Sequence, residues 1–148
     1  MNMKDERQFV GYSKYRSRLV DGHVHTELCP HGSGDRTAMM IEKAIELRIE
    51  KVCLTEHAPL PKAFAVEYGG DQKAYDTASL KLNQVDSYLE LGRQLQRAYG
   101  THIDISLGFE VDYIPGFETD IQGFLDRYGP LTDDNILSVH FMEGVNNA

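Results

Sequence analysis

The 148-residue sequence lacks several features that would assign it to common classes of protein. It contains only two cysteines, Cys29 and Cys53, which are too few for a disulfide scaffold and indicate a reduced, cytoplasmic protein. No apolar run approaches the roughly 18 residues that a membrane-spanning helix needs. The first 18 residues are charged rather than apolar, which is unlike a signal peptide.

Positive charge is also scarce. The chain carries 15 lysines and arginines against 23 aspartates and glutamates, giving a net charge of −8, and it has no basic run. Because contacts with phosphates dominate the affinity for duplex nucleic acid, an acidic chain is a poor candidate for a nucleic-acid-binding protein. The composition, 41% hydrophobic and 26% charged, is typical of a globular protein, and the length predicts one domain.

Short apolar runs alternate along the chain with amphipathic segments. We expect strands at 18–25, 51–56, 103–111 and 135–141, and helices at 35–48, 79–100 and about 121–128. Asp35 and Ser79 are the expected helix N-caps, and Gly100 suits a left-handed helix end. Residues 1–18 resemble a polar extension, and residues 58–78 a long loop with a functional role or mobility. This alternation predicts parallel strands with right-handed crossovers, and therefore an α/β fold, either an open sheet or a barrel.

Histidine or carboxylate residues lie near the carboxyl end of all four expected strands. They are His23 and His25, Glu56 and His57, Glu110 and Asp112, and His140, while His31 lies in the loop after the first strand. Side chains alternate along a strand, so His23 and His25 face the same way. Parallel α/β folds place their chemistry at this end of the strands. The sixth histidine, His102, precedes the third strand and is expected at the opposite end, on the surface.

Each of these signals is weak when taken alone. A single His-x-His occurs by chance, Glu56 and His57 could form a simple ion pair, and His140 could be a buried core histidine. Four strand ends with the same property favour a metal site instead. Imidazole and carboxylate together suit zinc, iron or manganese better than calcium. A shared carboxylate such as Glu110 could bridge two ions, an arrangement suited to the hydrolysis of phosphate esters.

Five motifs carry a family resemblance. They are Asp21-Gly22-His23-Val24-His25-Thr26, Cys29-Pro30-His31-Gly32, Thr55-Glu56-His57-Ala58-Pro59, Gly108-Phe109-Glu110-Val111-Asp112-Tyr113 and Leu137-Ser138-Val139-His140-Phe141. Together they resemble the polymerase-and-histidinol-phosphatase (PHP) superfamily and are most similar to its histidinol-phosphate phosphatases, over about residues 19–141. The resemblance implies an α/β fold that is part of a distorted (β/α)7 TIM-like barrel, with roughly the first four strands and three helices.

The resemblance also implies an activity, the hydrolysis of L-histidinol phosphate to L-histidinol and phosphate in histidine biosynthesis. It implies a centre of two or three divalent ions (Zn, Fe or Mn) with a metal-bound hydroxide as nucleophile, so that no protein nucleophile is needed. The ligands carried over by motif are His23 and His25 with Glu110, His31 with His57, and His140 with Glu110. Lys62, in the long loop, is the candidate for contacting the substrate phosphate.

Members of this superfamily are considerably longer and end with an Asp-x-His motif that completes their metal sites. We therefore expect residues 19–148 to be the N-terminal part of a phosphatase domain that is not competent alone. The expected partner is a small phosphate monoester, with no nucleic acid or membrane, and the oligomeric state is left open. The alternatives are a PHP-type phosphoesterase acting on nucleotides or DNA ends, and a non-catalytic metal-binding fragment. A structural zinc module is less favoured, because such sites cluster their Cys and His ligands.

Overall fold

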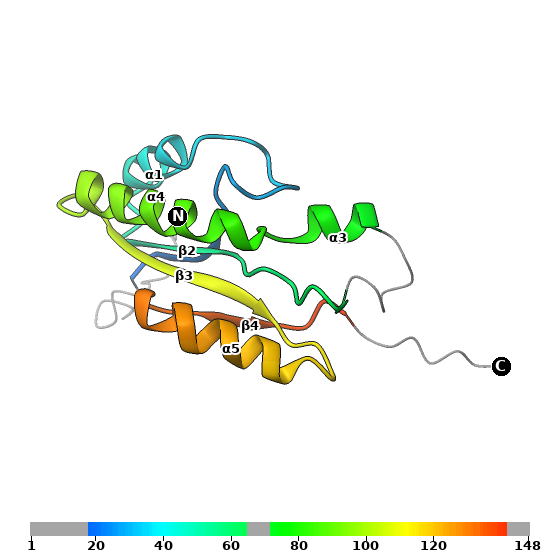
Figure 1. The fold of residues 1–148 in the computed structure, drawn as a ribbon. Helices are drawn as coiled ribbons and strands as arrows, with labels where there is room; N and C mark the ends of the chain where they lie inside the picture. The colour runs from blue at the N-terminus through cyan, green and yellow to red at the C-terminus, as the bar shows by residue number, and fades with distance from the viewer. Residues whose placement is uncertain (1–17, 65–71, 142–148) are drawn as a thin grey trace, which may run out of the picture.

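The computed structural model describes residues 18–64 and 72–141. Its strands and α-helices follow one another along the chain (Figure 1). They are β1 (Val20–Val24), α1 (Thr37–Glu46), β2 (Lys51–His57), α3 (Gln72–Ala78), α4 (Val85–Tyr99), β3 (Asp104–Asp112), α5 (Glu118–Tyr128) and β4 (Ile136–Ser138). Short 3₁₀ turns, η1 (Leu82–Gln84) and η2 (Gly129–Leu131), precede α4 and follow α5.

The strands form one sheet in the order β1-β2-β3-β4, and every neighbouring pair is parallel. Strands β2 and β3 pair without interruption from Lys51 opposite Asp104 to His57 opposite Glu110. The parallel α/β architecture that the sequence predicted is therefore confirmed. Because all the strands run the same way, their carboxyl ends lie along one edge of the sheet.

The hydrophobic core lies between one face of the sheet and the helices. It contains residues of α1, α4 and α5 packed against Leu54 of β2 and Leu107 and Phe109 of β3. A close approach of α4 depends on Gly92, where a Cβ atom would lie 2.3 Å from Leu107 Cδ1. The opposite face of β2 and β3 carries Thr55, His57, Ser106, Glu110 and Asp112 instead. The sheet thus has an apolar face toward the helices and a polar face at its carboxyl end.

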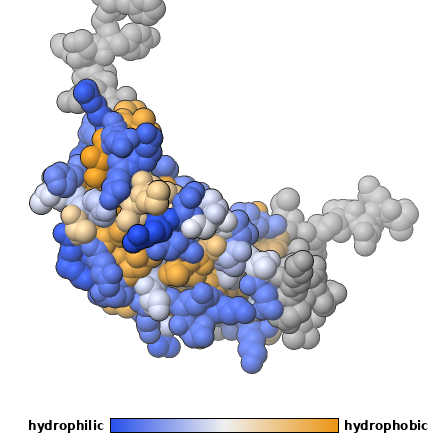
Figure 2. Space-filling view, turned by 90° about the horizontal axis from the view of Figure 1, so that it is seen from above, coloured by the Kyte–Doolittle hydropathy of each residue, from blue (hydrophilic) through white to orange (hydrophobic). Residues whose placement is uncertain are grey.

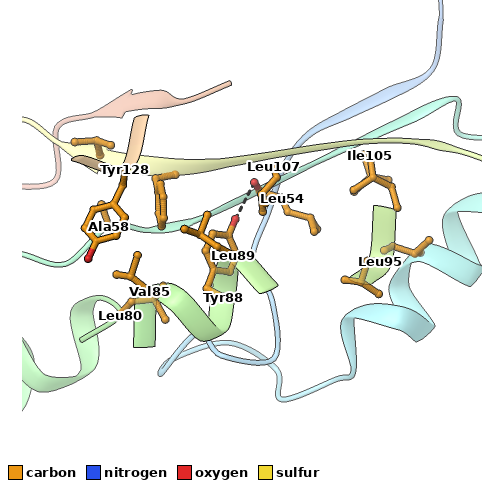
Figure 3. Close-up of a cluster of buried hydrophobic side chains, with 14 of the residues drawn as sticks. Leu54, Ala58, Leu80, Val85, Tyr88, Leu89, Leu95, Ile105, Leu107 and Tyr128 are labelled. Atoms are coloured by element: carbon orange, nitrogen blue, oxygen red, sulfur yellow. Dashed lines mark hydrogen bonds between the residues drawn. The ribbon is translucent and has the colours of Figure 1, made fainter. Parts of the chain in front are cut away.

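Tyr88 links α4 to the two central strands from within this core. Its side chain is fully buried, and its hydroxyl lies 2.9 Å from the carbonyl oxygen of Leu54 (Figure 3). It also lies 2.6 Å from the carbonyl oxygen of Gly108. Burial raises the pKa of Tyr88 far above its ordinary value, so the hydroxyl keeps its proton and donates to these carbonyls. The hydroxyl also accepts a hydrogen bond from the backbone N–H of Glu56, 3.3 Å away.

Strand β4 is shorter than the predicted strand at 135–141. Ahead of it, side chains replace the backbone as partners of β3: Leu107 N–H donates to Asp133 Oδ2 and Phe109 N–H to Asn135 Oδ1, each at 2.9 Å. After β4, the N–H of His140 donates to the Asp112 carboxylate at 3.3 Å. Regular pairing is therefore confined to Ile136–Ser138.

Two predicted N-caps are wrong. The first helix has Arg36 at its N-cap, and the Thr37 N–H donates to the side chain of Glu27 from an earlier loop. The second helix, α4, begins at Val85 after a 3₁₀ turn, not beside Ser79. Its C-cap, Gly100, is right-handed, with φ −61°, and not left-handed as expected. The Ser79 hydroxyl instead accepts from Leu60 N–H at 3.3 Å. Tertiary contacts thus decide these helix starts, where local capping rules suggest others.

The predicted loop at 58–78 is also only partly irregular, because α3 occupies its last seven residues. Residues 65–71 of that loop, and all but the last residue of the predicted polar extension at 1–18, lie outside the described residues.

The described surface mixes polar and apolar side chains. Figure 2 shows hydrophobic residues exposed among a majority of hydrophilic ones on the face that it presents. Exposed large apolar residues include Leu137 and Val139 near the C-terminal end of the described chain. Within the described ranges, no helix is long and apolar enough to cross a membrane.

Candidate metal centre

A register irregularity in β1 brings its two histidines to the polar face of the sheet. Asp21 pairs with Val52 and Val24 pairs with Leu54, so β1 contains one extra residue over this interval. Such a bulge changes which side chains face which way. Val24 consequently packs against the hydrophobic core, and His23 and His25, its neighbours on either side, face the polar side.

Four imidazole nitrogens converge on the carboxylate of Glu110, which is 3% exposed. Oε2 of Glu110 lies 2.9 Å from His23 Nε2, 3.2 Å from His57 Nδ1 and 3.4 Å from His25 Nε2. Its other oxygen, Oε1, lies 3.4 Å from His140 Nε2. Nε2 of His23 is also only 3.1 Å from Nε2 of His25. The structure thus brings together five of the six side chains that the sequence predicted as metal ligands.

His31, the remaining predicted ligand, joins this cluster from the loop after β1. Its ring centroid lies 5.0 Å from that of His57 and 6.3 Å from that of His25. His31 Nδ1 donates a hydrogen bond to the carbonyl oxygen of Thr77 in α3, at 2.7 Å. This bond leaves Nε2 of His31 as the nitrogen with a lone pair for a ligand.

Two carboxylates outside the predicted ligand set contact histidines of the cluster. Glu56 Oε1 lies 3.1 Å from His25 Nδ1, and Asp112 Oδ1 lies 2.8 Å from His140 Nδ1. An ionised carboxylate only accepts hydrogen bonds, so each Nδ1 is the donor. Both carboxylates lie in the strand-end motifs. The sequence does not reveal that each one contacts the Nδ1 atom of a histidine from a neighbouring strand.

Burial and hydrogen bonding set the protonation of the cluster. Burial alone would raise the pKa of Glu56, but hydrogen bonds from His25 and Thr26 outweigh it and hold that pKa below its ordinary value. The hydrogen bond with Glu56 raises the pKa of His25, against the opposing effect of burial. Burial lowers the pKa of His57 although Glu110 opposes the change. His57 is therefore neutral near pH 7, the form that binds metals.

The side chains of the cluster fit divalent metal ions. Three sets each present ligand atoms within 4.8 Å of one another: His23, His25 and Glu110; His25, Cys29 and Glu56; and His57, Asp112 and His140. His57 Nδ1 is buried and lies beside Glu110 without forming a hydrogen bond within the described chain. A buried nitrogen without a hydrogen-bond partner, aimed at a carboxylate among other imidazoles, is typical of a metal ligand. The ligand role of each residue stays a prediction.

Lys62 lines a cavity that is also lined by Asp112, the hydrogen-bond partner of His140 in the cluster. The Lys62 side chain is exposed, and the cavity, of about 530 Å³, is also lined by Pro61, Tyr75 and Arg127. None of the six predicted metal ligands is among the described residues that line this cavity. A role of Lys62 in phosphate binding remains a prediction. His102 lines a different cavity, with Arg48 and Asp104 at the start of β3, as expected for the opposite end of the sheet.

Comparison with known proteins identifies related chains. The family model described as "PHP domain" matches residues 21–147. The histidinol-phosphatase of Bacillus subtilis (strain 168) is 41% identical over 122 residues, which are 82% of this chain and 44% of that protein. The chain therefore spans less than half the length of this relative.

Two solved structures share the fold. The crystal structure of hisK from Listeria monocytogenes superposes with a TM-score of 0.81 and 43% identity, over 84% of this chain and 46% of that one. Histidinol phosphate phosphatase from Lactococcus lactis, complexed with zinc, L-histidinol and phosphate, gives a TM-score of 0.63 and 25% identity, over 84% of this chain and 41% of that one.

Proposed function

Because the chain belongs to the PHP family, whose model matches residues 21–147, we propose that it is a metal-dependent phosphomonoesterase for L-histidinol phosphate. The products are L-histidinol and inorganic phosphate. The observation that carries this proposal is the convergence of four imidazole nitrogens on Glu110 at the carboxyl ends of the strands. A set of this kind, with mixed nitrogen and oxygen ligands, suits zinc, iron or manganese.

The proposal assigns the predicted ligands to a centre of two or three divalent ions. His23 and His25 hold one ion with Glu110, His31 and His57 hold a second, and His140 shares Glu110 at a third. Such a centre supplies positive charge that polarises a phosphoryl oxygen and lowers the pKa of water. The protein's own contribution is to present the imidazoles to the ions. Burial favours the neutral form of His57, and the Nδ1 hydrogen bonds of His25 and His140 orient their rings.

The substrate assignment rests on the relatives. The Bacillus subtilis relative is named a histidinol-phosphatase, and the Lactococcus lactis structure contains zinc, L-histidinol and phosphate. We further propose that Lys62 contacts the substrate phosphate and that the protein acts in the cytoplasm without nucleic-acid or membrane partners. The two buried, unpaired cysteines support the cytoplasmic assignment, and the net charge of −8 supports the absence of a nucleic-acid partner.

To test the proposal, the rate of phosphate release from L-histidinol phosphate is compared with the rate from nucleoside monophosphates at equal concentration. The zinc-loaded chain is assayed alone and with the part of the Bacillus subtilis relative that lies outside the match, because the match covers 44% of that relative. We expect turnover that prefers L-histidinol phosphate in at least one of the two assays. Equal or faster turnover of nucleotides, or no turnover in either assay, contradicts the proposal.

A matched pair of variants tests whether turnover depends on the metal centre. Glu110→Gln removes the charge that four imidazoles share, and we expect it to abolish turnover. Glu46→Gln makes the same chemical change on the exposed surface of α1, and we expect it to leave turnover unchanged. An active Glu110→Gln variant would rule out the proposed centre.

A further inference from the structure

We propose that Glu56 is a positioning residue, which fixes the tautomer and ring orientation of His25 and thereby strengthens metal binding at the cluster. The inference deepens the proposed function, because it concerns the same metal centre, but Glu56 is not one of the ligands assigned above. Glu56 is fully buried, and its Oε1 lies 3.1 Å from His25 Nδ1.

The sheet places Glu56 behind the metal centre. In the register of β2 and β3, Glu56 lies opposite Phe109, and His57 lies opposite Glu110. Because successive side chains point to opposite faces, Glu56 leaves the strand on the helix-covered face and His57 on the polar face. Glu56 therefore approaches His25 from the side of the core, at the nitrogen that faces away from Glu110.

Two backbone N–H groups and the hydroxyl of Thr26 donate hydrogen bonds to the Glu56 carboxylate. Oε2 accepts from Thr26 N–H at 2.8 Å and from the Thr26 hydroxyl at 2.7 Å, and Oε1 lies 3.2 Å from His57 N–H. Backbone N–H groups cannot turn away or lose their proton, so they hold the carboxylate in place as an acceptor. A cation among these N–H groups would meet the positive ends of their dipoles. The set of His25, Cys29 and Glu56 is therefore a support for His25 and not a further metal site.

The tautomer of His25 follows from this contact. A neutral imidazole carries its proton on one nitrogen only. Glu56 keeps that proton on Nδ1, so Nε2 has a free lone pair, and Nε2 is the atom that lies 3.1 Å from His23 Nε2 and 3.4 Å from Glu110. Carboxylates that orient metal-binding histidines in this way commonly raise metal affinity.

Glu56→Gln tests the inference with a nearly isosteric change. The amide oxygen is expected to stay with the two donors of Thr26, which turns the amide NH₂ toward His25 Nδ1. His25 must then accept at Nδ1 and carry its proton on Nε2, where it blocks metal binding. We expect zinc affinity, measured on the purified chain by competition with a chromophoric chelator, to fall about 10- to 100-fold. We expect the number of ions bound at saturation to stay the same.

The tautomer itself gives a readout that a merely structural role would not change. Long-range ¹H–¹⁵N NMR of the metal-free chain, at a pH where His25 is neutral, should show Nδ1–H in the wild type and Nε2–H in Glu56→Gln. The matched control is Thr55→Val, a buried change at the adjacent position of β2, which should alter neither the affinity nor the tautomer.

Three results would overturn the inference. They are an unchanged zinc affinity in a folded Glu56→Gln variant, the loss of one bound ion in that variant, and an Nε2–H tautomer in the wild type. The wild-type NMR measurement decides the question even if the variant fails to fold. If the wild-type chain binds no metal at all, the proposed function fails, and the metal-free NMR comparison still judges the role of Glu56 separately.

Discussion

Thr55 lies at the centre of β2, 2% exposed, and its hydroxyl has no hydrogen-bond partner within the described chain. A buried polar group without a partner destabilises a fold, because it has lost its hydrogen bonds with water. Valine has nearly the same shape and no hydroxyl. We expect Thr55→Val to raise the free energy of unfolding by about 1 to 2 kcal/mol in urea titrations. Thr101→Val, at an exposed position, is the control and should change stability by less than about 0.5 kcal/mol. A destabilised Thr55→Val variant would contradict the assignment of an unsatisfied hydroxyl.

The residues of the metal cluster differ in how far the sequence could predict them. His57, Glu110 and His140 could be grouped because each ends an apolar run, and strand ends of a parallel sheet share an edge. The supporting role of Glu56 could not be predicted in the same way. It depends on the bulge in β1, which sets where His25 Nδ1 lies, and a register irregularity leaves no clear signal in a single sequence.

Where two segments pack very closely, only glycine fits at the point of contact. At Gly108 in β3, a Cβ atom would lie 1.5 Å from the carbonyl oxygen of Asp134, which is backbone and cannot rotate away. We expect Gly108→Ala to separate the segment before β4 from β3 and to lower the free energy of unfolding by about 3 kcal/mol. Gly123→Ala makes the same change inside α5, where a Cβ atom meets nothing within 4 Å. That variant should gain about 0.5 to 1 kcal/mol, since alanine favours helix. Urea titrations measure both, and equal effects of the two would contradict the close approach at Gly108.

The order and type of the main elements follow from the sequence, but several boundaries do not. Apolar runs predicted the central strands β2 and β3 because a parallel sheet buries such strands on both faces, whereas the edge strands β1 and β4 are mostly exposed and follow from shorter apolar segments. The start of α4 was misplaced because Ser79 has the right chemistry for an N-cap but uses its hydroxyl to bind Leu60 instead. The same serine hydroxyl can cap a helix or accept a hydrogen bond from a distant backbone group. Local capping rules cannot predict which of these the folded chain uses.

At the scale of the whole molecule, the metal cluster connects segments that are far apart in the chain. Its proposed ligands come from the end of β1, the following loop, the ends of β2 and β3, and the residues after β4. Four of these groups crowd around the single carboxylate of Glu110. An ion that binds only the folded arrangement must therefore stabilise the sheet as a unit, by an amount that grows with metal concentration.

We expect zinc at 100 times its dissociation constant to raise the free energy of unfolding by about 2.7 kcal/mol. Thermal melts with added zinc and after dialysis against a chelator measure this difference. Glu110→Gln should lose most of this response, because it removes the carboxylate shared by the ions proposed at His23 with His25 and at His140. His102→Ala, at the opposite end of the sheet, should keep the full response. A zinc response that survives Glu110→Gln and disappears with His102→Ala would place the stabilising ion at the wrong end of the strands, and the cluster around Glu110 would lose its assignment as the metal centre.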